Sequence, residues 1–453
     1  MKNTLVLIFF TLLSQFIQGQ KILGDWYGSL NIQGTELPLV FHIKKQDSTY
    51  SSTMDSPKQM AVGLAVAKTT FKNSQLTLEA PAMGIKYTGD FNPKEDSIKG
   101  TFQQGGLRLA LNLSRNNIIQ NIKRPQEPKE PFSYHSEEIT FYNKHDDITL
   151  AGTLTTPEDL KKFPVVILIS GSGPQNRDEE IMDHKPFLVL SDYLTRHGIA
   201  VLRYDDRGVA ESEGEYASAT SEDLSRDTKA AIKYLQSRKD IKISKLGLIG
   251  HSEGGIIAPL VASKSNEVDF IVLLAGSVIK GKELLLLQKK LIEEKSGISD
   301  SIVNRSQEIF QGAYNIIASN SDTDGTLKDE LERYFKEETN NSMNASQMNK
   351  LIENMTSPWM KYFISYDPST VLKDINIPTL ALFGKKDVQV PALENSIALE
   401  KLKNRKIEII QMDNLNHLFQ ESETGMPNEY FEIEQTMSPK VMNLISEWIL
   451  AKE

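Results

Sequence analysis

The sequence predicts a small all-β domain followed by a doubly wound, mostly parallel α/β sheet domain that carries an inserted helical cap. Three observations support this fold class. Short alternating runs of apolar and polar residues, separated by turn residues, fill residues 20–115. From residue 137 onward, continuous apolar runs alternate with segments of helical period, as in parallel strands that are buried on both faces. Polar helical segments interrupt this alternation over residues 280–365, after which it resumes.

Length and composition limit the number of domains and the kinds of partner and site that the chain can have. A chain of 453 residues is long enough for two or three domains. The net charge of −9 provides no basic face for nucleic acid, so we expect no nucleic-acid partner. The chain contains no cysteine, which excludes disulfides, thiolate metal sites and a lipid-modified cysteine anchor. Nothing in the sequence indicates an oligomeric state.

Residues 1–19 have the three-part layout of a secretory signal. Lys2 precedes an apolar run from Leu5 to about Ile17, and small or polar residues follow this run. The run is short for a membrane span, and we expect cleavage near Gly19. We therefore expect an exported bacterial protein, periplasmic or secreted, without a membrane span after cleavage. An uncleaved N-terminal anchor is the alternative.

The first domain, residues 20–115, is predicted to be a small antiparallel barrel or sandwich, because its short strands follow one another at turn spacing. It contains no recognisable catalytic set. His42 lies in the middle of a predicted strand and is expected to be structural rather than a ligand. We expect this domain to be an interaction or folding module, with ligand binding by the barrel as the alternative. Residues 116–136 are rich in proline and charge and are predicted to form a linker.

Residues 137–279 are predicted to form the first part of the α/β core. The runs "EEITFYN" and "ITLAGTLTTP" indicate an antiparallel strand pair. The next segments alternate between strand and helix, starting and ending with a strand. In chain order they are "PVVILISGSG", "FLVLSDYLTRHG", "IAVLRYD", "SEDLSRDTKAAIKYLQSR", "KLGLIG", "GGIIAPLVAS" and "VDFIVLLAGS".

The polar helices of residues 280–365 are inserted between two strands of the same predicted sheet. The strand pattern resumes within residues 366–453, at "IPTLALFG" and "KIEIIQM", and "SPKVMNLISEWILAK" closes the chain as a helix. In a parallel sheet, an insertion at the carboxyl end of a strand lies over the crevice where ligands bind. The inserted helices are therefore predicted to form a cap or lid.

The stretch "GLIGHSEGGIIA" places Ser252 between Gly250 and Gly254, where a buried strand meets a helix. In a sharp strand-to-helix turn, a serine is held with its oxygen exposed above the sheet. The residues two before and two after it crowd together, which favours glycine at both positions. The dipole of the new helix also favours a developing negative charge. We therefore predict Ser252 as a nucleophile.

A serine nucleophile needs a base, and the base needs an acid to orient it. Both follow in the order Ser, Asp, His that this type of turn requires. Asp387 follows the strand "TLALFG", and His417 follows the next strand, "IEIIQM". His417 is predicted as the general base and Asp387 as its partner. Asp413 is a rival acid, but it lies on the same loop as His417.

Two backbone N–H groups are expected to bind the oxyanion. One belongs to Glu253, directly after the nucleophile, and the other to Ser172 in the loop "SGSGPQNRDEE". The stretch "RYDDRGVAESEG" also follows a strand and places Arg207 at the rim of the same crevice. Arg207 is a candidate substrate or rim residue, with loop support through ion pairs as the alternative.

Together, "GHSEGG", "SGSGPQNRDE", "RYDDRG", "GKKDVQVP" and "LNHLFQ" resemble the α/β-hydrolase superfamily. More narrowly, the chain is similar to secreted bacterial carboxylesterases of the serine-aminopeptidase/dienelactone-hydrolase-like group that carry an N-terminal β domain. The resemblance implies Ser252, Asp387 and His417 as the catalytic triad, with no metal or organic cofactor. Many relatives have "HG" where this chain has "SG", at Ser170 and Gly171.

The triad predicts acyl transfer but not the substrate. The resemblance and the apolar stretch "LLLLQ" (284–288) favour a hydrolase of small or medium acyl esters, although such leucines usually pack in a helix core. An aminopeptidase is the second hypothesis, in which Glu253 faces a substrate amine. Alternatively, Glu253 pairs with a cation such as Arg207 or faces solvent. A thioesterase ranks third. A non-enzymatic alternative is a binding protein without catalytic activity, and the complete predicted triad argues against it.

Overall fold

The computed structural model describes residues 22–32, 35–46, 49–59, 61–117, 123–158, 160–320 and 325–452. The predicted signal segment, residues 1–19, lies outside the described residues. The chain divides into two compact units between Lys123 and Arg124, within the segment predicted as a linker. Each unit is described separately below.

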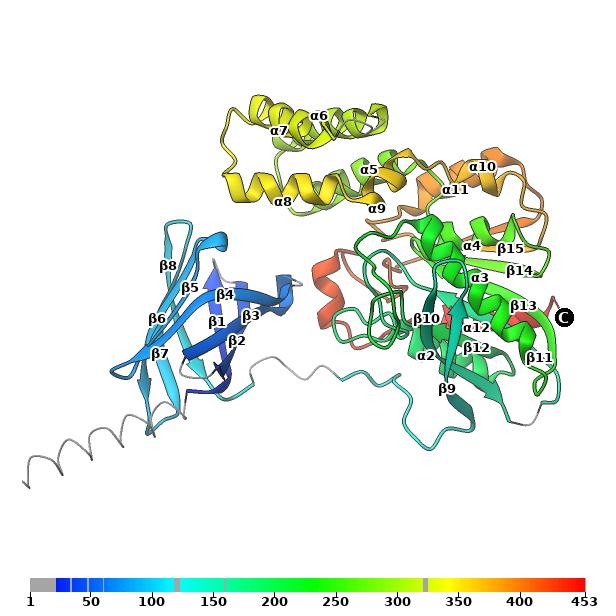
Figure 1. Ribbon diagram of the computed structural model, residues 1–453, viewed down its shortest axis with the longest axis horizontal. Coiled ribbons are helices and arrows are strands. Elements are labelled where there is room, and N and C mark those ends of the chain that lie inside the picture. The colour runs from blue at the N-terminus through cyan, green and yellow to red at the C-terminus, as the bar shows by residue number, and fades with distance from the viewer. Residues whose placement is uncertain are drawn as a thin grey trace, which may run out of the picture. The chain divides into compact units, whose positions relative to one another are not determined.

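The first unit is a closed eight-stranded antiparallel barrel in which each strand pairs with the next and β1 pairs with β8 (Figure 1). Its strands are β1 (Gly24–Ile32), β2 (Thr35–Gln46), β3 (Thr49–Ser56), β4 (Ala61–Lys72), β5 (Gln75–Ala80), β6 (Ile85–Asn92), β7 (Ser97–Gln104) and β8 (Leu107–Ser114). Short 3-10 turns, η1 (Pro57–Gln59) and η2 (Pro81–Met83), connect β3 to β4 and β5 to β6.

Aromatic side chains fill the interior of the barrel. Alternate residues along each strand point inward, so Trp26, Phe41 and Tyr87 are almost fully buried. The ring of Phe41 stacks on that of Tyr87, with centroids 5.7 Å apart, and the edge of Trp26 meets Phe91 at 5.9 Å. His42 faces outward, and its two ring nitrogens lie within hydrogen-bonding distance of Asp25 and Asp55. The described interior of the barrel is therefore filled by packed side chains.

The second unit is built on an eight-stranded mixed sheet with the order β16-β15-β14-β13-β11-β12-β10-β9. The strands are β9 (Tyr134–Asn143), β10 (Ile148–Pro157), β11 (Phe163–Ile169), β12 (Ala200–Tyr204), β13 (Ile243–His251), β14 (Phe270–Leu274), β15 (Thr379–Gly384) and β16 (Ile407–Met412). The strands β9 and β10 are antiparallel to their neighbours, and β11 to β16 are mutually parallel. This arrangement confirms the predicted fold class.

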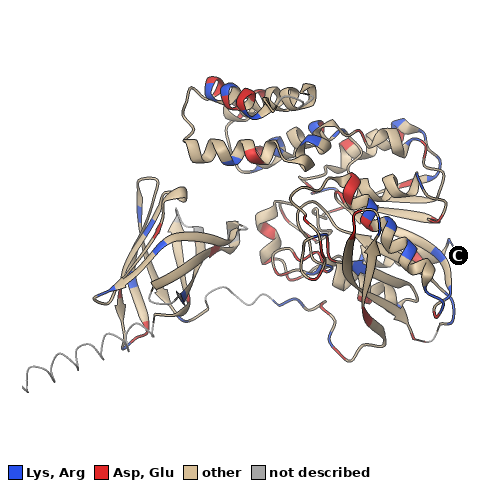
Figure 2. Ribbon diagram, in the orientation of Figure 1, with Lys and Arg blue, Asp and Glu red and all other residues tan. Residues whose placement is uncertain are grey.

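Helices cover this sheet: α2 (Pro186–Arg196), α3 (Ser221–Ser237), α4 (Gly254–Ala262), α11 (Ala392–Leu402) and α12 (Pro439–Leu450). A further 3-10 helix, η3 (Pro427–Glu432), precedes α12. The start of α3 is fixed by a capping box in which Thr220 and Asp223 each accept a hydrogen bond from the backbone N–H of the other. Helix α3 packs beside α4, and α2 packs beside α12. Basic and acidic residues are interspersed along α3 (Figure 2).

The segment between β14 and β15 forms the predicted cap. It consists of α5 (Gly281–Lys295), α6 (Asp300–Ser319), α7 (Leu327–Glu338), α8 (Ala345–Met355) and α9 (Pro358–Ser365), and the short α10 (Ser369–Leu372) leads back to the sheet. The cap has a hydrophobic cluster of its own, which includes Leu331, Phe335 and Met348. Among the described residues, none of the helices is long and apolar enough to cross a bilayer.

Candidate active site

Ser252 lies in a sharp turn between β13 and α4. Its φ of 51° is in the left-handed region that non-glycine residues rarely occupy. Its backbone N–H donates to the carbonyl oxygen of Leu274 on the neighbouring strand, at 2.9 Å. A Cβ added to Gly250 would lie 1.9 Å from the carbonyl oxygen of Gly254, and one added to Gly254 would lie 2.1 Å from that of Ile169. The turn therefore requires glycine at both positions.

Asp387 and His417 follow β15 and β16 and meet at the carboxyl edge of the sheet. The Nδ1 atom of His417 lies 2.7 Å from Oδ2 of Asp387, and both side chains are buried. The other oxygen of Asp387 accepts hydrogen bonds from the backbone N–H groups of Gln389, at 2.7 Å, and Val390, at 2.9 Å. The rival acid Asp413 is exposed and pairs with Lys385. Asp387 is thus the carboxylate that contacts His417.

The structure brings Ser252 to the same edge as His417, but the two side chains are not hydrogen-bonded to each other in the described part of the chain. The contact between the two segments is made by His251, the residue before Ser252. Its Nε2 lies 3.0 Å from the backbone oxygen of His417, and the two rings lie with centroids 4.8 Å apart.

A cavity of about 80 Å³ lies beside Ser252. It is lined on one side by the sheet domain and on the other by the cap helices α5 and α9. The lining residues are Ser172, Ser252, Glu253, Ile256, Ser277, Leu284, Leu285, Gln288, Trp359, Phe363, Gln389 and Val390. Leu284 and Leu285 thus line the cavity, whereas Leu286 belongs to the cap's own cluster.

The loop that follows β11 is held by acidic side chains. Ser170 donates its hydroxyl to Asp206 at 2.8 Å, and the backbone N–H of Gly171 donates to Glu179 at 2.7 Å. These bonds fix the loop directly before Ser172. Directly after it, the backbone N–H of Gly173 donates to the hydroxyl of Tyr216 at 2.9 Å. Among the backbone hydrogen bonds of the described residues, neither Ser172 nor Glu253 uses its N–H. Both groups are therefore available to a ligand.

Glu253 is buried against the cap, so the expectations that it faces solvent or pairs with Arg207 were wrong. Its Oε1 atom accepts hydrogen bonds from the hydroxyl of Ser221, at 2.6 Å, and from the indole N–H of Trp359, at 2.8 Å. Burial raises the pKa of Glu253, and these hydrogen bonds oppose the shift. Within the described residues, its Oε2 atom has no hydrogen-bond partner.

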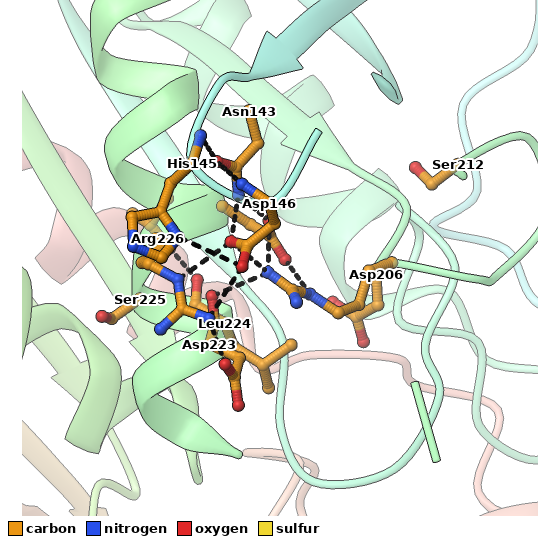
Figure 3. Close-up of polar contacts among 12 residues, drawn as sticks. Asn143, His145, Asp146, Asp206, Ser212, Asp223, Leu224, Ser225 and Arg226 are labelled. Atoms are coloured by element: carbon orange, nitrogen blue, oxygen red, sulfur yellow. Dashed lines mark hydrogen bonds and ion pairs between the residues drawn. The ribbon is translucent and has the colours of Figure 1, made fainter. Parts of the chain in front are cut away.

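Arg207 lies in a cluster of ion pairs and is not among the residues that line the cavity. Its guanidinium donates to both oxygens of Asp227, at 2.7 and 2.8 Å, and to Asp146 at 3.2 Å. Asp146 also binds Arg226, and Figure 3 shows this aspartate among Asn143, His145 and Arg226. The cluster joins the turn between β9 and β10 to α3. This position supports the structural interpretation of Arg207.

Three residues at the site were not singled out by the sequence analysis: Glu179, His251 and Trp359. A polar residue at the end of an otherwise apolar strand was a signal for His251. Glu179 lies in a loop crowded with charges, so nothing distinguished it from its neighbours. Trp359 lies in the cap, where the sequence indicated helices but not which face meets the sheet.

Residues 185–423 match the family described as serine aminopeptidase, S33, and this match spans more than half of the 453 residues. The chain belongs to this family. Its membership and its fold confirm the predicted resemblance to α/β-hydrolases of the serine-aminopeptidase group.

Two curated relatives extend the comparison of this family member. Esterase EstD of Thermotoga maritima is 28% identical over 363 residues, which cover 77% of this chain and 78% of the relative. The protein YfhR of Salmonella typhi, itself uncharacterised, is 38% identical over 66 residues, which cover 15% of this chain and 22% of YfhR.

Solved structures of two esterases match part of this chain at low sequence identity. The esterase Pf2001 of Pyrococcus furiosus has a TM-score of 0.44 and 14% identity, with 70% of this chain and 91% of the other covered. Est1E of Butyrivibrio proteoclasticus, solved with ferulic acid, has a TM-score of 0.41 and 16% identity, with 69% and 98% covered.

Proposed function

We propose that this hydrolase cleaves carboxylic esters of small or medium acyl groups through an acyl-enzyme formed on Ser252. The observation that carries the proposal is the 2.7 Å contact between His417 and Asp387 at the sheet edge where Ser252 is presented. The Thermotoga maritima relative is named an esterase, which supports an ester as the bond that is cleaved.

In the proposed mechanism, His417 removes the proton of Ser252 as the hydroxyl attacks the ester carbonyl. Asp387 keeps the proton of the imidazole on Nδ1, so that the other ring nitrogen acts as the base. The N–H groups of Ser172 and Glu253 bind the oxyanion. His417 then protonates the leaving alcohol, and water attacks the acyl-enzyme by the same route in reverse.

The cavity supports a short acyl group. A volume of about 80 Å³ is small beside ordinary ligand pockets of roughly 300–1,000 Å³. Its apolar walls include Ile256, Leu284 and Phe363. Short chains such as acetyl and butyryl are therefore expected to react faster than octanoyl.

One observation favours an aminopeptidase as the second candidate. The Oε2 atom of Glu253 is buried, has no partner among the described residues, and belongs to a side chain that lines the cavity. A substrate ammonium would complete its interactions, since a buried carboxylate is costly without a counter-charge. The description of the family, serine aminopeptidase, is compatible with this alternative.

Location is a separate proposal. We infer export from the pattern of residues 1–19, with a charged residue followed by a short apolar run. Mass spectrometry of the protein recovered from the bacterial envelope or culture medium tests it. A mature chain that begins near residue 20 supports export, and an intact N-terminus argues for the anchor.

The reaction is tested with residues 20–453 as purified wild type and as the variant Ser252→Ala. The substrates are p-nitrophenyl acetate, butyrate and octanoate, together with the p-nitroanilides of alanine and leucine. Ester turnover that falls by about 10⁶ in Ser252→Ala supports the proposal. Anilide turnover without ester turnover would replace it with the aminopeptidase. Ser263→Ala, at the other end of α4, is the matched control and is expected to behave as wild type.

A further inference from the structure

Two buried ionisable side chains lie behind Ser252 and have no part in the mechanism proposed above. Glu179 is 1% exposed and His251 is 5% exposed. Oε1 of Glu179 lies 2.8 Å from Nδ1 of His251, and the same oxygen accepts the backbone N–H of Gly171 at 2.7 Å. On the other side of the ring, Nε2 lies 3.0 Å from the backbone oxygen of His417.

These contacts favour the doubly protonated form of His251. Both ring nitrogens face oxygen atoms that only accept hydrogen bonds, a carboxylate and a carbonyl. A neutral imidazole carries one N–H, whereas an imidazolium carries two and satisfies both acceptors. Burial acts to lower the pKa of His251, but the Glu179 carboxylate, the His417 carbonyl and the nearby Asp387 together raise it above its ordinary value.

We propose that Glu179 and His251 form a buried ion pair that positions the oxyanion loop and the His417 loop around Ser252. The proposal rests on the function proposed above, because it assigns these residues a role in the same reaction. Both are positioning residues, since neither side chain contacts the cavity. The working form of the pair is carboxylate and imidazolium.

The pair joins three segments that are distant in the sequence. The reaction requires these segments to keep fixed positions relative to one another. Glu179 binds the loop that carries Ser172, His251 ends the strand that presents Ser252, and the ring contacts the loop of His417. The packing is tight: a Cβ added to Gly171 would lie 3.2 Å from both Oε1 of Glu179 and Cβ of Ser252.

The backbone of Glu179 gives a second indication. Its φ of 51° lies in the left-handed region, which is unfavourable for a residue other than glycine, asparagine or aspartate. Such a conformation persists where surrounding contacts determine it. Here those contacts are the hydrogen bonds that its carboxylate makes to Gly171 and His251.

A pH dependence follows from the charge of the pair. The ionisable side chains around His251 are Glu179, His417 and Asp387. Below the pKa of His251 the ring donates to both acceptors. As the pH rises through that pKa, one proton leaves and one of the two contacts is lost. Turnover is therefore expected to fall on the alkaline side.

The test compares wild type with Glu179→Gln, which retains the shape of the side chain and removes its charge. Its kcat for p-nitrophenyl acetate is expected to fall about 10- to 100-fold, because small misplacements of reacting groups have costs of that size. KM is expected to change by less than about threefold. The alkaline limb of the kcat profile is expected to disappear, because His251 is then neutral throughout. Asp227→Asn is the matched control: it also removes a buried charge paired with a cation, and it should retain the wild-type pH profile.

A second measurement does not depend on turnover. Nitrogen-15 NMR of the histidine rings in wild type reports whether both nitrogens of His251 carry protons at pH 7, with His251→Gln used to assign the signal. A doubly protonated ring supports the ion pair even if Ser252→Ala shows that the proposed function is wrong. A neutral His251 in wild type would overturn the inference. A Glu179→Gln enzyme with unchanged kcat and an intact alkaline limb would overturn it as well.

Discussion

The indole N–H of Trp359 donates to Oε1 of Glu253 at 2.8 Å, and this bond joins a cap helix to the residue that follows Ser252. The same oxygen accepts the hydroxyl of Ser221 at the start of α3. Trp359 stacks on Phe363 within α9, with ring centroids 4.8 Å apart, and both rings line the cavity. A single carboxylate therefore fixes the position of the cap wall relative to the candidate nucleophile.

Trp359→Phe removes this donor and retains an aromatic ring. We expect KM for p-nitrophenyl butyrate to rise about 5- to 30-fold, because a buried acidic group loses a hydrogen bond worth roughly 1–2 kcal/mol. Steady-state kinetics measures the change. Trp448→Phe makes the same replacement on α12, where the indole donates to Glu408 at 2.9 Å, and its KM should not change. Equal KM values for all three proteins would show that the bond does not position the cap.

Gly250→Ala is expected to destabilise the protein by more than about 4 kcal/mol. The added Cβ would lie 1.9 Å from the backbone oxygen of Gly254, and this oxygen can move away only if the whole turn changes its conformation. Thermal unfolding followed by circular dichroism gives the size of the effect. Gly297→Ala is the comparison variant, because it introduces backbone strain without a steric clash. That glycine has a φ of 76° and open space around it, so only conformational strain of about 1–2 kcal/mol is expected. Similar melting temperatures for the two variants would contradict the steric argument.

Arg207→Lys separates the structural role of Arg207 from a role in substrate binding. Lysine lacks the planar fork with which arginine donates two parallel hydrogen bonds to Asp227, so we expect a loss of about 1–3 kcal/mol in the free energy of unfolding. Both kcat and KM should stay within about twofold of wild type. Arg305→Lys, at an exposed pair with Glu338, should leave the melting temperature unchanged. A large rise in KM for Arg207→Lys would restore the substrate role.

His184 is expected to make stability depend on pH. It is fully buried between Thr436 and the backbone oxygen of Tyr430, and burial lowers its pKa from 6.5 to about 4. A lowered pKa means that the unfolded chain binds the proton first, so stability decreases as the pH falls from about 6.5 toward 4. The shift corresponds to at most about 3 kcal/mol.

Urea unfolding of wild type and His184→Gln at several pH values measures this slope. The variant should be less stable at pH 7 and should lose part of the decrease between pH 6.5 and 4. His197→Gln, which changes an exposed histidine, should retain the wild-type slope. An unchanged slope in His184→Gln would show that other groups cause the acid sensitivity.

The sheet could be predicted because strands buried on both faces have to be apolar along their length. The run from Val165 to Ile169 is fully buried, and so is that from Phe270 to Leu274. Since parallel strands end at one edge, the residues that follow them in the sequence come together in space. That rule is the reason why Asp387 and His417 could be named before their contact was known.

Glu179 could not be found in the same way. Its partner His251 is 72 positions away, and the charged loop around Glu179 contains other acids that fit a surface role equally well. The orientation of Glu253 also depended on the cap, because Trp359 approaches from a helix whose packing on the sheet has no periodic signal in the sequence. Polar contacts between distant loops depend on the tertiary structure, whereas burial along a strand leaves a local pattern.

The left-handed backbone at Ser252 also restricts how this position can change in evolution. Threonine carries a hydroxyl, but its branched Cβ is strongly disfavoured at a φ of 51°. Cysteine has an unbranched side chain like that of serine and is free of this conflict. Among hydroxyl and thiol residues, serine and cysteine are therefore interchangeable in shape at position 252. A change from serine to cysteine, which would replace the nucleophilic oxygen with sulfur, is therefore compatible with this backbone. A change to threonine would require the turn to adopt another conformation.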